Sequence, residues 1–551
     1  MGKASKKIIC ILHGYLLEGS GSNLWTRSII RSLCQQGQTV HLLCQENHPE
    51  IYDFIAAVYH YYPDGIIKTK LQRAVPYPGR CIMHKPYLGE TLPVYVWDKY
   101  DEFADVQPMI QLPDEKIEKY LDANILVLRQ IVKEQHVKIL HANHAVLMSV
   151  VAQRVAEEFS LPYAIMPHGS AIEYAVKKDK RFFDYALEAC SAADLIFVIG
   201  KEIRQRVHNL FPQIKDLDSK MIDLNLGVDT SLFRPVDRQD RTGHIYELCT
   251  SLTDTERGKK PEQSSALREA LFNTISKPEL LGLIKTNSKY NGKLTDFNVE
   301  HRLTGLNWQQ AQVILFVGRL IASKGIHSII AALPYIFEKF PKACLIIVGH
   351  GPLREPLEAL LWALENGSRS LVENIVDWGT ELEGSGNQPL VEIRHYFDRL
   401  QVAGTLEKYF DKARRYIRED RVIFTGYLTH RELRYLFPAC DVAIFPSVVA
   451  EAGPLVFLEA LASGCFPIGT YFAGMAASID SIAGAVPDRI LEMMKLSPET
   501  ENTVSELVKN VTNAFSIGNT YKTVLHELAV EKYDWQKISL RLSKELFDLT
   551  K

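Results

Sequence analysis

The sequence has no long hydrophobic run and almost no net charge. No segment approaches the roughly 18 apolar residues that a membrane-spanning helix needs. Its 63 basic and 66 acidic residues nearly cancel, giving a formal net charge of −3, which argues against binding to nucleic acid through overall charge. The basic N-terminus precedes an apolar stretch, but His13 and Gly14 interrupt that stretch and no cleavage site follows. We therefore expect a cytoplasmic protein with a first strand at 7–12.

Paired cysteines and metal-binding patterns are also absent. None of the nine cysteines forms a Cys-x-x-Cys pair, so buried free thiols explain them better than disulfides or a zinc site. The acidic pair at Asp216–Asp218 lies in a polar stretch and is expected to be a turn. His141 and His144 form a His-x-x-His pattern, but no third ligand follows at a suitable spacing. We expect no metal and no cofactor.

What the sequence does contain is an alternation of short apolar runs and helical patterns, which is typical of parallel α/β sheets. A chain of 551 residues is too long for one ordinary core. The run from "KIICIL" to "DLIFVIG" predicts a first domain over 1–235. A second series, from "VILFVGRL" onward, predicts another over 311–515, with a helical insertion near 360–418. The polar stretch 236–310, with one clear amphipathic helix in "ALREALFNTI", is expected to be an insertion or linker, and 516–551 a C-terminal helical segment.

The turn "GSGSNLWTR" (Gly19–Arg27) joins the first strand to a helix expected at 23–36 and closed by Gly37. Glycines allow close backbone approach to an anion, and a helix N-terminus offers free N–H groups. The dinucleotide fingerprint is not met, because Leu24 takes the place of its third glycine. An ordinary strand–helix turn explains these residues equally well.

Two cations follow the strand end in "FVGRLIASKGI". Lys324 falls where a helix begins, although the dipole at a helix N-terminus disfavours a cation. An anion between Arg319 and Lys324 would remove that conflict, and together the two side chains suit a diphosphate. Because parallel sheets bind ligands at the carboxyl ends of their strands, this interpretation is stronger than two solvated cations.

Another strand end, in "MPHGSAIEY", carries His168. Its position favours a functional role, although single histidines are more often structural. The basic run "KKDKR" (Lys177–Arg181) follows within a few residues. Such runs are usually solvated surface. This run could also attract an acceptor bearing a carboxylate or phosphate, or touch an anionic membrane.

The stretch "SVVAEAGPLVFLEALASGCFP" places Glu451 in a loop and Glu459 inside an apolar helix. Burial of an ionised carboxylate is unfavourable without a partner. Taken alone, the stretch fits a helix with one partly exposed acid.

These motifs in order, with "GVDTSLFRP", "VGHGPL", "GYLTHREL" and "YDWQKISLRL", resemble retaining glycosyltransferases of glycosyltransferase family 4. The resemblance spans the chain outside the two insertions. It implies the GT-B fold, with two Rossmann-like doubly wound parallel-sheet domains facing a central cleft. The last motif is similar to the helix that crosses back to the first domain in that family.

The resemblance also implies roles for individual residues. Glu451 would bind the donor sugar, Glu459 the ribose, Arg319 and Lys324 the diphosphate, and His168 the transferring sugar. The candidate donor-binding set is Gly19, Gly21, Ser22, Arg319, Lys324, Gly426, Tyr427, Leu428, Glu451, Gly453, Leu455 and Glu459. The sequence departs from the family pattern at Pro454, which removes one backbone N–H donor, and in its reduced glycine loop.

The expected activity is metal-independent transfer of a hexose, with retention, from a UDP-, GDP- or ADP-linked donor. Preorganised cations and N–H groups can stabilise the departing diphosphate. A small anionic, sugar or lipid-linked acceptor is expected. The alternatives are a catalytically silent sugar-nucleotide-binding protein and an NAD-dependent oxidoreductase. The missing third glycine, and the lack of an acid directly at the second strand's end, argue against the oxidoreductase.

Overall fold

The computed structural model describes residues 8–18, 20–95, 103, 105–273, 276–449 and 453–551. The chain divides into two compact units, the first formed by Met1–Gly227 with Lys532–Lys551 and the second by Val228–Glu531. The first unit therefore ends slightly before residue 235. Only the last part of 516–551 returns to it.

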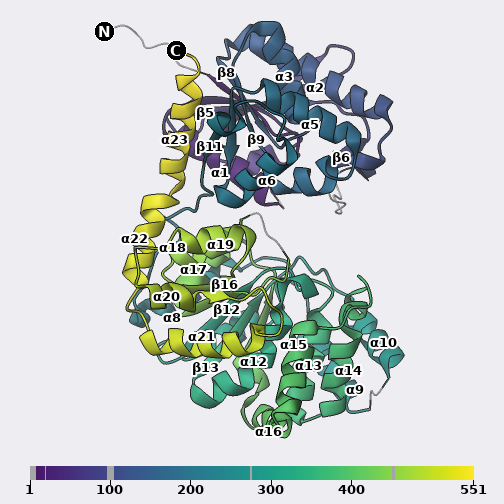
Figure 1. Ribbon diagram of the computed structural model, residues 1–551, viewed down its shortest axis with the longest axis vertical. Helices are drawn as coiled ribbons and strands as arrows, with labels where there is room; N and C mark the ends of the chain where they lie inside the picture. Colours follow the sequence, from purple (N-terminus) through teal and green to yellow (C-terminus); the bar gives the residue numbers. More distant parts are fainter. Residues whose placement is uncertain (1–7, 19, 96–102, 104, 274–275, 450–452) are drawn as a thin grey trace. The chain divides into compact units, whose positions relative to one another are not determined.

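Within the described residues, the first unit is built on a nine-stranded sheet (Figure 1). The strand order is β11-β10-β9-β8-β1-β2-β5-β3-β4. Neighbouring strands run parallel except β3 and β4, which are antiparallel. The strands are β1 (Ile9–Leu12), β2 (Thr39–Leu43), β3 (Ile55–Tyr61), β4 (Ile67–Gln72), β5 (Arg80–Pro86), β8 (Ile139–Asn143), β9 (Tyr163–Met166), β10 (Leu195–Val198) and β11 (Met221–Asp223), with the separate parallel pair β6 (Thr91–Val94) and β7 (Asp105–Pro108).

Helices cover this sheet, which explains why its central strands are apolar along their whole length. Every residue of β1 is fully buried. The helices are α1 (Gly21–Gln35), α2 (Asp114–Gln135), α3 (Met148–Phe159), α4 (Gly169–Ala171), α5 (Lys180–Ala192), α6 (Gly200–Leu210), α7 (Leu217–Lys220) and α23 (Trp535–Asp548).

Helix α1 ends as its sequence predicts. Gly37 takes a left-handed conformation with φ of 85°. Its N–H donates to the carbonyl of Cys34, and the N–H of Gln38 donates to that of Leu33. These two bonds form a Schellman motif and satisfy carbonyls left open at the helix end. The motif directs the chain into β2.

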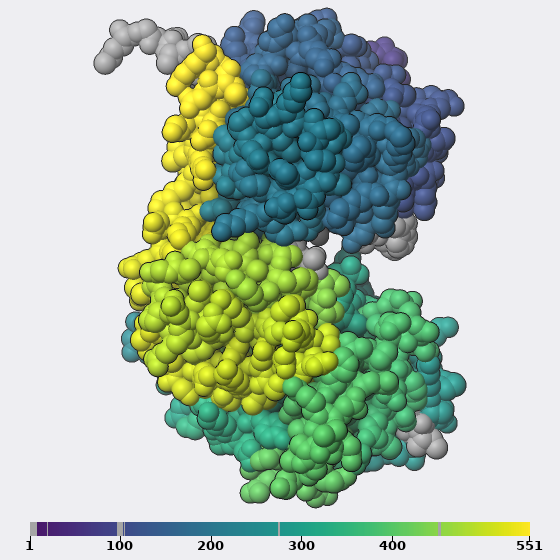
Figure 2. Space-filling view, viewed as in Figure 1, coloured from purple at the N-terminus to yellow at the C-terminus, as the bar shows by residue number. Residues whose placement is uncertain are grey.

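The final helix, α23, packs on the first unit. The Oγ atoms of Ser32 on α1 and Ser539 on α23 lie 2.7 Å apart. Leu542 and Leu546 join the core formed by α1 and the sheet. A Cβ at Gly227 would lie 2.3 Å from the Trp535 ring, so glycine there leaves room for the indole. Figure 2 shows α23, in yellow, lying along the surface of this unit.

The second unit holds a six-stranded, fully parallel sheet in the order β14-β13-β12-β15-β16-β17 among its described residues. Its strands are β12 (Gln312–Val317), β13 (Ala343–Val348), β14 (Val422–Gly426), β15 (Val442–Phe445), β16 (Phe466–Thr470) and β17 (Lys495–Leu496). Its helices outside the two insertions are α12 (Ile326–Lys339), α17 (His430–Ala439), α18 (Leu455–Ala462), α19 (Ala473–Asp480), α20 (Asp488–Met493) and α21 (Thr503–Ile517), followed by α22 (Lys522–Lys532).

The polar stretch 236–310 is more ordered than its composition predicts. It forms α8 (Arg241–Ser251), α9 (Pro261–Leu271), α10 (Lys277–Asn287) and α11 (Val299–Thr304) within the second unit, so the expectation of one clear helix is wrong. Arg241 on α8 is fully buried, and its Nη2 lies 2.7 Å from the Oδ1 of Asp441 beside β15. Ion pairs of this kind allow a polar segment to pack on the sheet.

The second insertion is helical, as predicted. It contains α13 (Arg354–Asn366), α14 (Arg369–Trp378), α15 (Val391–Val402) and α16 (Leu406–Tyr416). No helix within the described residues is long and apolar enough to cross a membrane. All nine cysteines are free, and all but Cys249 are buried.

Candidate functional site

In the second unit, the predicted donor residues collect at the carboxyl ends of its parallel strands. Gly318 and Arg319 directly follow β12, and Gly426 ends β14. Gly453 and Leu455 lie at the start of α18, downstream of β15. Two expected site residues, Gly19 and Glu451, lie outside the described residues.

Glycines bring the backbones of these strand-end loops very close together. A Cβ at Gly349, after β13, would lie 1.8 Å from the carbonyl oxygen of Gly318. Gly325 has a φ of 68°, and a Cβ there would lie 2.0 Å from the carbonyl oxygen of Pro446. The N–H of Leu320 donates to the carbonyl of His350 over 2.8 Å. The loop that carries Arg319 is thus fixed by backbone contacts on both sides.

The two cations of this loop differ in exposure. Arg319 is exposed, whereas Lys324, at the end of a short 3-10 turn (Ala322–Lys324), is half-buried. The loop is held further by Ser447, whose Oγ donates to the carbonyl of Ser323 over 3.1 Å. Glu383, from the second insertion, accepts the N–H of Ala322 at 2.8 Å. Sequence reasoning missed this acid, which lies about sixty residues away in a segment without a motif.

Glu459 lies one turn into α18 and is only 4% exposed. Its Oε1 is 2.7 Å from the Nε2 of His430, the first residue of α17. Its Oε2 is buried and has no hydrogen-bond partner within the described residues. A buried carboxylate oxygen without a partner is unfavourable, so this atom marks a position where a hydroxyl donor would be stabilised. Sequence reasoning missed His430, although "GYLTHREL" contains it.

The loop after β14 is held by the first insertion. Gly426 has a φ of 72°, and a Cβ there would lie 2.6 Å from the carbonyl of Leu294. The Oγ1 of Thr295 donates to the carbonyl of Tyr427 over 2.8 Å. Tyr427 is 40% exposed, while Leu428 is buried. The segment 294–296 therefore fixes the backbone of two predicted donor residues, Gly426 and Tyr427.

In the first unit, His168 lies beside other polar residues at the strand ends. It follows β9 and is 7% exposed, with its Nε2 3.4 Å from the Oδ1 of Asn143. Its ring lies 4.8 Å from that of His144 and 5.8 Å from that of Trp25. Burial, with a smaller contribution from His13 and His141, lowers the pKa of His168 to about 3. The imidazole is therefore neutral near pH 7.

The glycine loop of the first unit leads into α1, with Gly21 and Ser22 as its first residues. The Oγ of Ser20 caps the helix by accepting the N–H of Asn23. A Cβ at Gly21 would meet nothing within 4 Å, so no steric contact explains the glycine there. Ser22 is half-buried.

Glu46, just after β2, is already fully engaged by its own chain. Its carboxylate accepts the N–H groups of Leu17, Asn47 and His48 at 2.8–2.9 Å and the hydroxyl of Tyr52 at 3.2 Å. An NAD-binding fold would use an acid near this position for the ribose. Glu46 is committed to structure, which argues further against the oxidoreductase.

The basic run at Lys177–Arg181 is largely compensated locally. Lys177 pairs with Glu173, and Lys180 with Asp184. Arg181 pairs with both Asp114 and Asp179. This arrangement leaves less positive charge available to an anionic acceptor than the sequence indicated. Over the described residues, no group of three or more His, Cys, Asp or Glu side chains could hold a metal ion.

Part of the chain is similar to known proteins. Residues 305–373 and 397–481 match the family model of glycosyl transferases group 1. An uncharacterized glycosyltransferase of Methanocaldococcus jannaschii is 23% identical over 315 residues, covering 53% of this chain and 58% of that protein. The chain thus matches little more than half the length of this curated relative.

Solved structures share the fold across nearly the whole chain. Sucrose-phosphate synthase from Thermosynechococcus elongatus aligns with a TM-score of 0.52 at 15% identity, covering 98% of this chain and 99% of that one. The catalytic domain of starch synthase IV from Arabidopsis thaliana, bound to ADP and acarbose, aligns with a TM-score of 0.54 at 12% identity, covering 99% and 100%. The chain therefore has the GT-B fold, and part of its second unit matches the glycosyl transferases group 1 model.

Proposed function

We propose that this protein transfers a hexose from a nucleoside diphosphate sugar to an acceptor hydroxyl, with retention at the anomeric carbon and without a metal ion. The observation that carries the proposal is the buried Oε2 of Glu459, which lacks a partner within the described residues. A ribose hydroxyl would satisfy this atom. The group 1 match around it and the ADP in a protein of similar fold both favour a nucleotide ligand.

The chemistry assigned to the second unit is stabilisation of the leaving group. The bond from the anomeric carbon to the diphosphate breaks as the acceptor oxygen bonds to that carbon, and the acceptor hydroxyl gives its proton to the departing diphosphate oxygen. The diphosphate leaves with the electron pair. Arg319, Lys324 and the N–H groups at the start of α18 would stabilise the charge that develops on it. Glu451 would hold the hydroxyls of the sugar.

In this proposal His168 acts as a neutral hydrogen-bonding group toward the transferring sugar, because burial keeps its imidazole deprotonated near pH 7. A protonated histidine could serve as a general acid, but His168 does not carry that proton. It can orient a sugar hydroxyl through one ring nitrogen.

We assign the acceptor to the first unit. A pocket at the ends of β2, β3 and β5 has an empty volume of about 950 Å³. Tyr61, Tyr62 and Tyr87 line it, together with Lys85 and Glu90. Aromatic faces combined with a few polar groups suit a sugar-containing acceptor.

The experiment uses UDP-, GDP- and ADP-linked hexoses with a panel of glycoside and lipid-linked acceptors. Release of nucleoside diphosphate identifies the donor, and proton NMR of the first-formed product reads its anomeric configuration. Retention with one donor is the expected result. Inversion would contradict the retaining mechanism. Binding of a nucleotide sugar with no transfer to any acceptor would favour the catalytically silent binding protein.

A further inference from the structure

The second unit contains a hollow, and none of the predicted donor residues lines it. It lies between the first insertion and α13, beside the edge strand β14, and its empty volume is about 750 Å³. The first turns of α9, the outward face of α13 and the residues before β14 form its walls.

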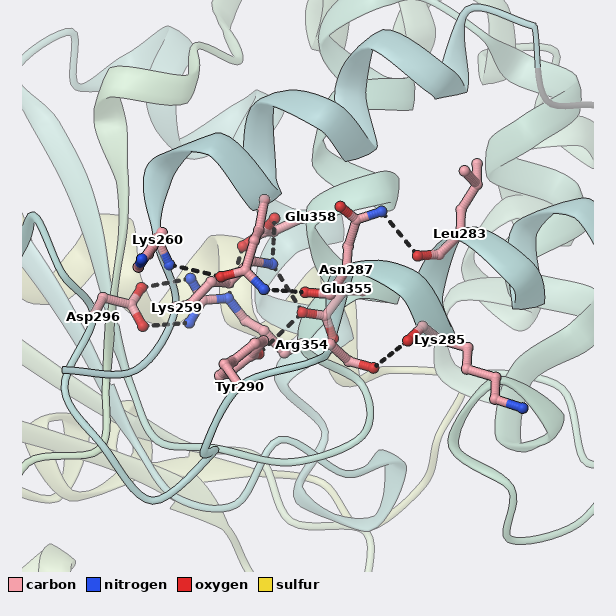
Figure 3. Close-up of polar contacts among 12 residues, drawn as sticks. Lys259, Lys260, Leu283, Lys285, Asn287, Tyr290, Asp296, Arg354, Glu355 and Glu358 are labelled. Carbon is pink, nitrogen blue, oxygen red and sulfur yellow. Dashed lines mark hydrogen bonds and ion pairs between the residues drawn. The ribbon is translucent and has the colours of Figure 1, made fainter.

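The floor of the hollow is a closed network of buried ion pairs (Figure 3). Lys259 lies 2.8 Å from Glu355 and 3.0 Å from Glu358. Arg354 holds both oxygens of Asp296, the nearer at 2.6 Å, and its Nε lies 2.7 Å from Glu358. These side chains are at most 5% exposed. The network joins two cations to three carboxylates and provides a rigid base.

Three further cations line the hollow and have no acidic partner within the described residues. Lys260 is exposed. Arg302 donates only to the carbonyl of Val422, at 2.6 Å, and Arg418 only to backbone carbonyls. Burial and the neighbouring Arg354 lower the pKa of Arg302, as expected for a guanidinium without a counter-ion.

Counted together with Glu355 of the floor, the hollow has six basic and five acidic side chains, an excess of one positive charge. The acid Glu365 also faces the hollow and makes no hydrogen bond within the described residues. Burial raises the pKa of Glu365. The indole of Trp362 and the hydroxyl of Ser264 complete the lining on the same side. Cations are thus combined with an aromatic face and a carboxylate acceptor.

We propose that this hollow is a binding site for a small sugar phosphate, separate from the donor site. Lys260, Arg302 and Arg418 would hold the dianionic phosphate through charge-assisted hydrogen bonds. Glu365 and Ser264 would accept hydroxyl hydrogens of the sugar, and Trp362 would cover one face of its ring. A phosphate ester supplies negative charge to Lys260, Arg302 and Arg418, which have no acidic partner within the described residues.

The test measures calorimetric binding of hexose 6-phosphate and inorganic phosphate to the full chain carrying Arg319→Ala and Lys324→Ala, which removes phosphate binding at the donor loop. The expected result is saturable binding of hexose phosphate, with inorganic phosphate at least about tenfold weaker because it lacks the hydroxyls. No binding of either ligand at millimolar concentration would overturn the proposal. Equal affinities would overturn the assignment of a sugar.

Two variants in this background test the location. Lys260→Gln with Arg418→Gln removes two cations. Ser264→Asp adds a negative charge to the hollow near the N-terminal end of α9. Because the helix dipole favours an anion at this end, the variant should keep its fold. Each should weaken binding about tenfold or more. Lys285→Gln, on the exposed surface of α10, is the matched control and should change the affinity less than twofold. Unchanged binding in both pocket variants would overturn the site.

Discussion

The Nε2 of His430 lies 2.7 Å from the Oε1 of Glu459, while the Oε2 of this buried carboxylate has no hydrogen-bond partner within the described residues. His430 is the first residue of α17, and Glu459 lies one turn into α18. The two helices follow different strands of the parallel sheet, β14 and β15. His430 therefore orients the carboxylate so that one acceptor site remains for a ligand.

Because His430 acts through Glu459 in this account, His430→Gln should raise the donor KM about three- to tenfold with little change in kcat. This range corresponds to about 0.5–1.5 kcal/mol, the net contribution of an ordinary hydrogen bond. Steady-state kinetics at varied donor concentration measures the effects on KM and kcat separately. His301→Gln, at an exposed position of α11, is the control. A fall in kcat at unchanged KM would contradict the positioning role.

Arg319→Ala and Lys324→Ala should each lower kcat/KM severely while the fold is retained. Removing a charge-assisted contact to the leaving group is expected to cost about 2–4 kcal/mol of transition-state stabilisation. Lys339→Ala, at the far end of α12, controls for a general loss of positive charge. Near wild-type turnover by either loop variant would show that the diphosphate lies elsewhere.

Activity should persist in EDTA, since the account assigns the leaving-group charge to Arg319, Lys324 and backbone N–H groups. The measurement compares initial rates before and after exhaustive chelation, with apo enzyme confirmed by elemental analysis. Loss of activity that magnesium or manganese restores would show that a metal ion takes part.

The buried network of the first insertion predicts acid sensitivity of the second unit. Burial alone would raise the pKa of Glu358, but Arg354 and Lys259 outweigh it and lower this pKa to about 2. The carboxylate thus stabilises the fold fully above its unfolded pKa, near 4.5, and this contribution disappears as the pH falls toward 2. At neutral pH the ionised Glu358 contributes about 3 kcal/mol to the free energy of unfolding.

Hydrogen exchange of peptides covering α13, corrected for intrinsic rates, measures this loss between pH 5 and 2.5. Glu358→Gln should be less stable than wild type at pH 7 and should have a flatter pH dependence. An equally steep pH dependence in the variant would assign the acid transition to other groups.

The positions of Arg319 and Gly426 at strand ends could be predicted, because buried parallel strands are short apolar runs and the loops after them carry motifs. Glu459 could be singled out for another reason, since an acid within an apolar helix is conspicuous. Their roles in binding a donor stay predictions. His430 was missed because its partner lies in another motif. The helices of 236–310 were missed for a related reason. Arg241 and Lys259 look like surface residues in a polar sequence, but both are buried in ion pairs that depend on residues far along the chain.

Strands β3 and β5 were also absent from the prediction. Histidines, tyrosines and basic residues interrupt their apolar pattern, and β4 at the sheet edge is mostly exposed. Their pairing with β2 and with each other fixes them in the sheet. Such long-range pairing leaves little trace in a local pattern.

The most direct test of the central claim is calorimetric binding of UDP, GDP and ADP to the wild-type chain and to Glu459→Gln. The substitution keeps the shape of the side chain but replaces a charged acceptor, so hydrogen bonds from the ribose hydroxyls should weaken. The account predicts that at least one nucleoside diphosphate binds the wild type and binds Glu459→Gln about tenfold or more weakly. Equal affinity for both proteins, or no binding of any of the three, would contradict it.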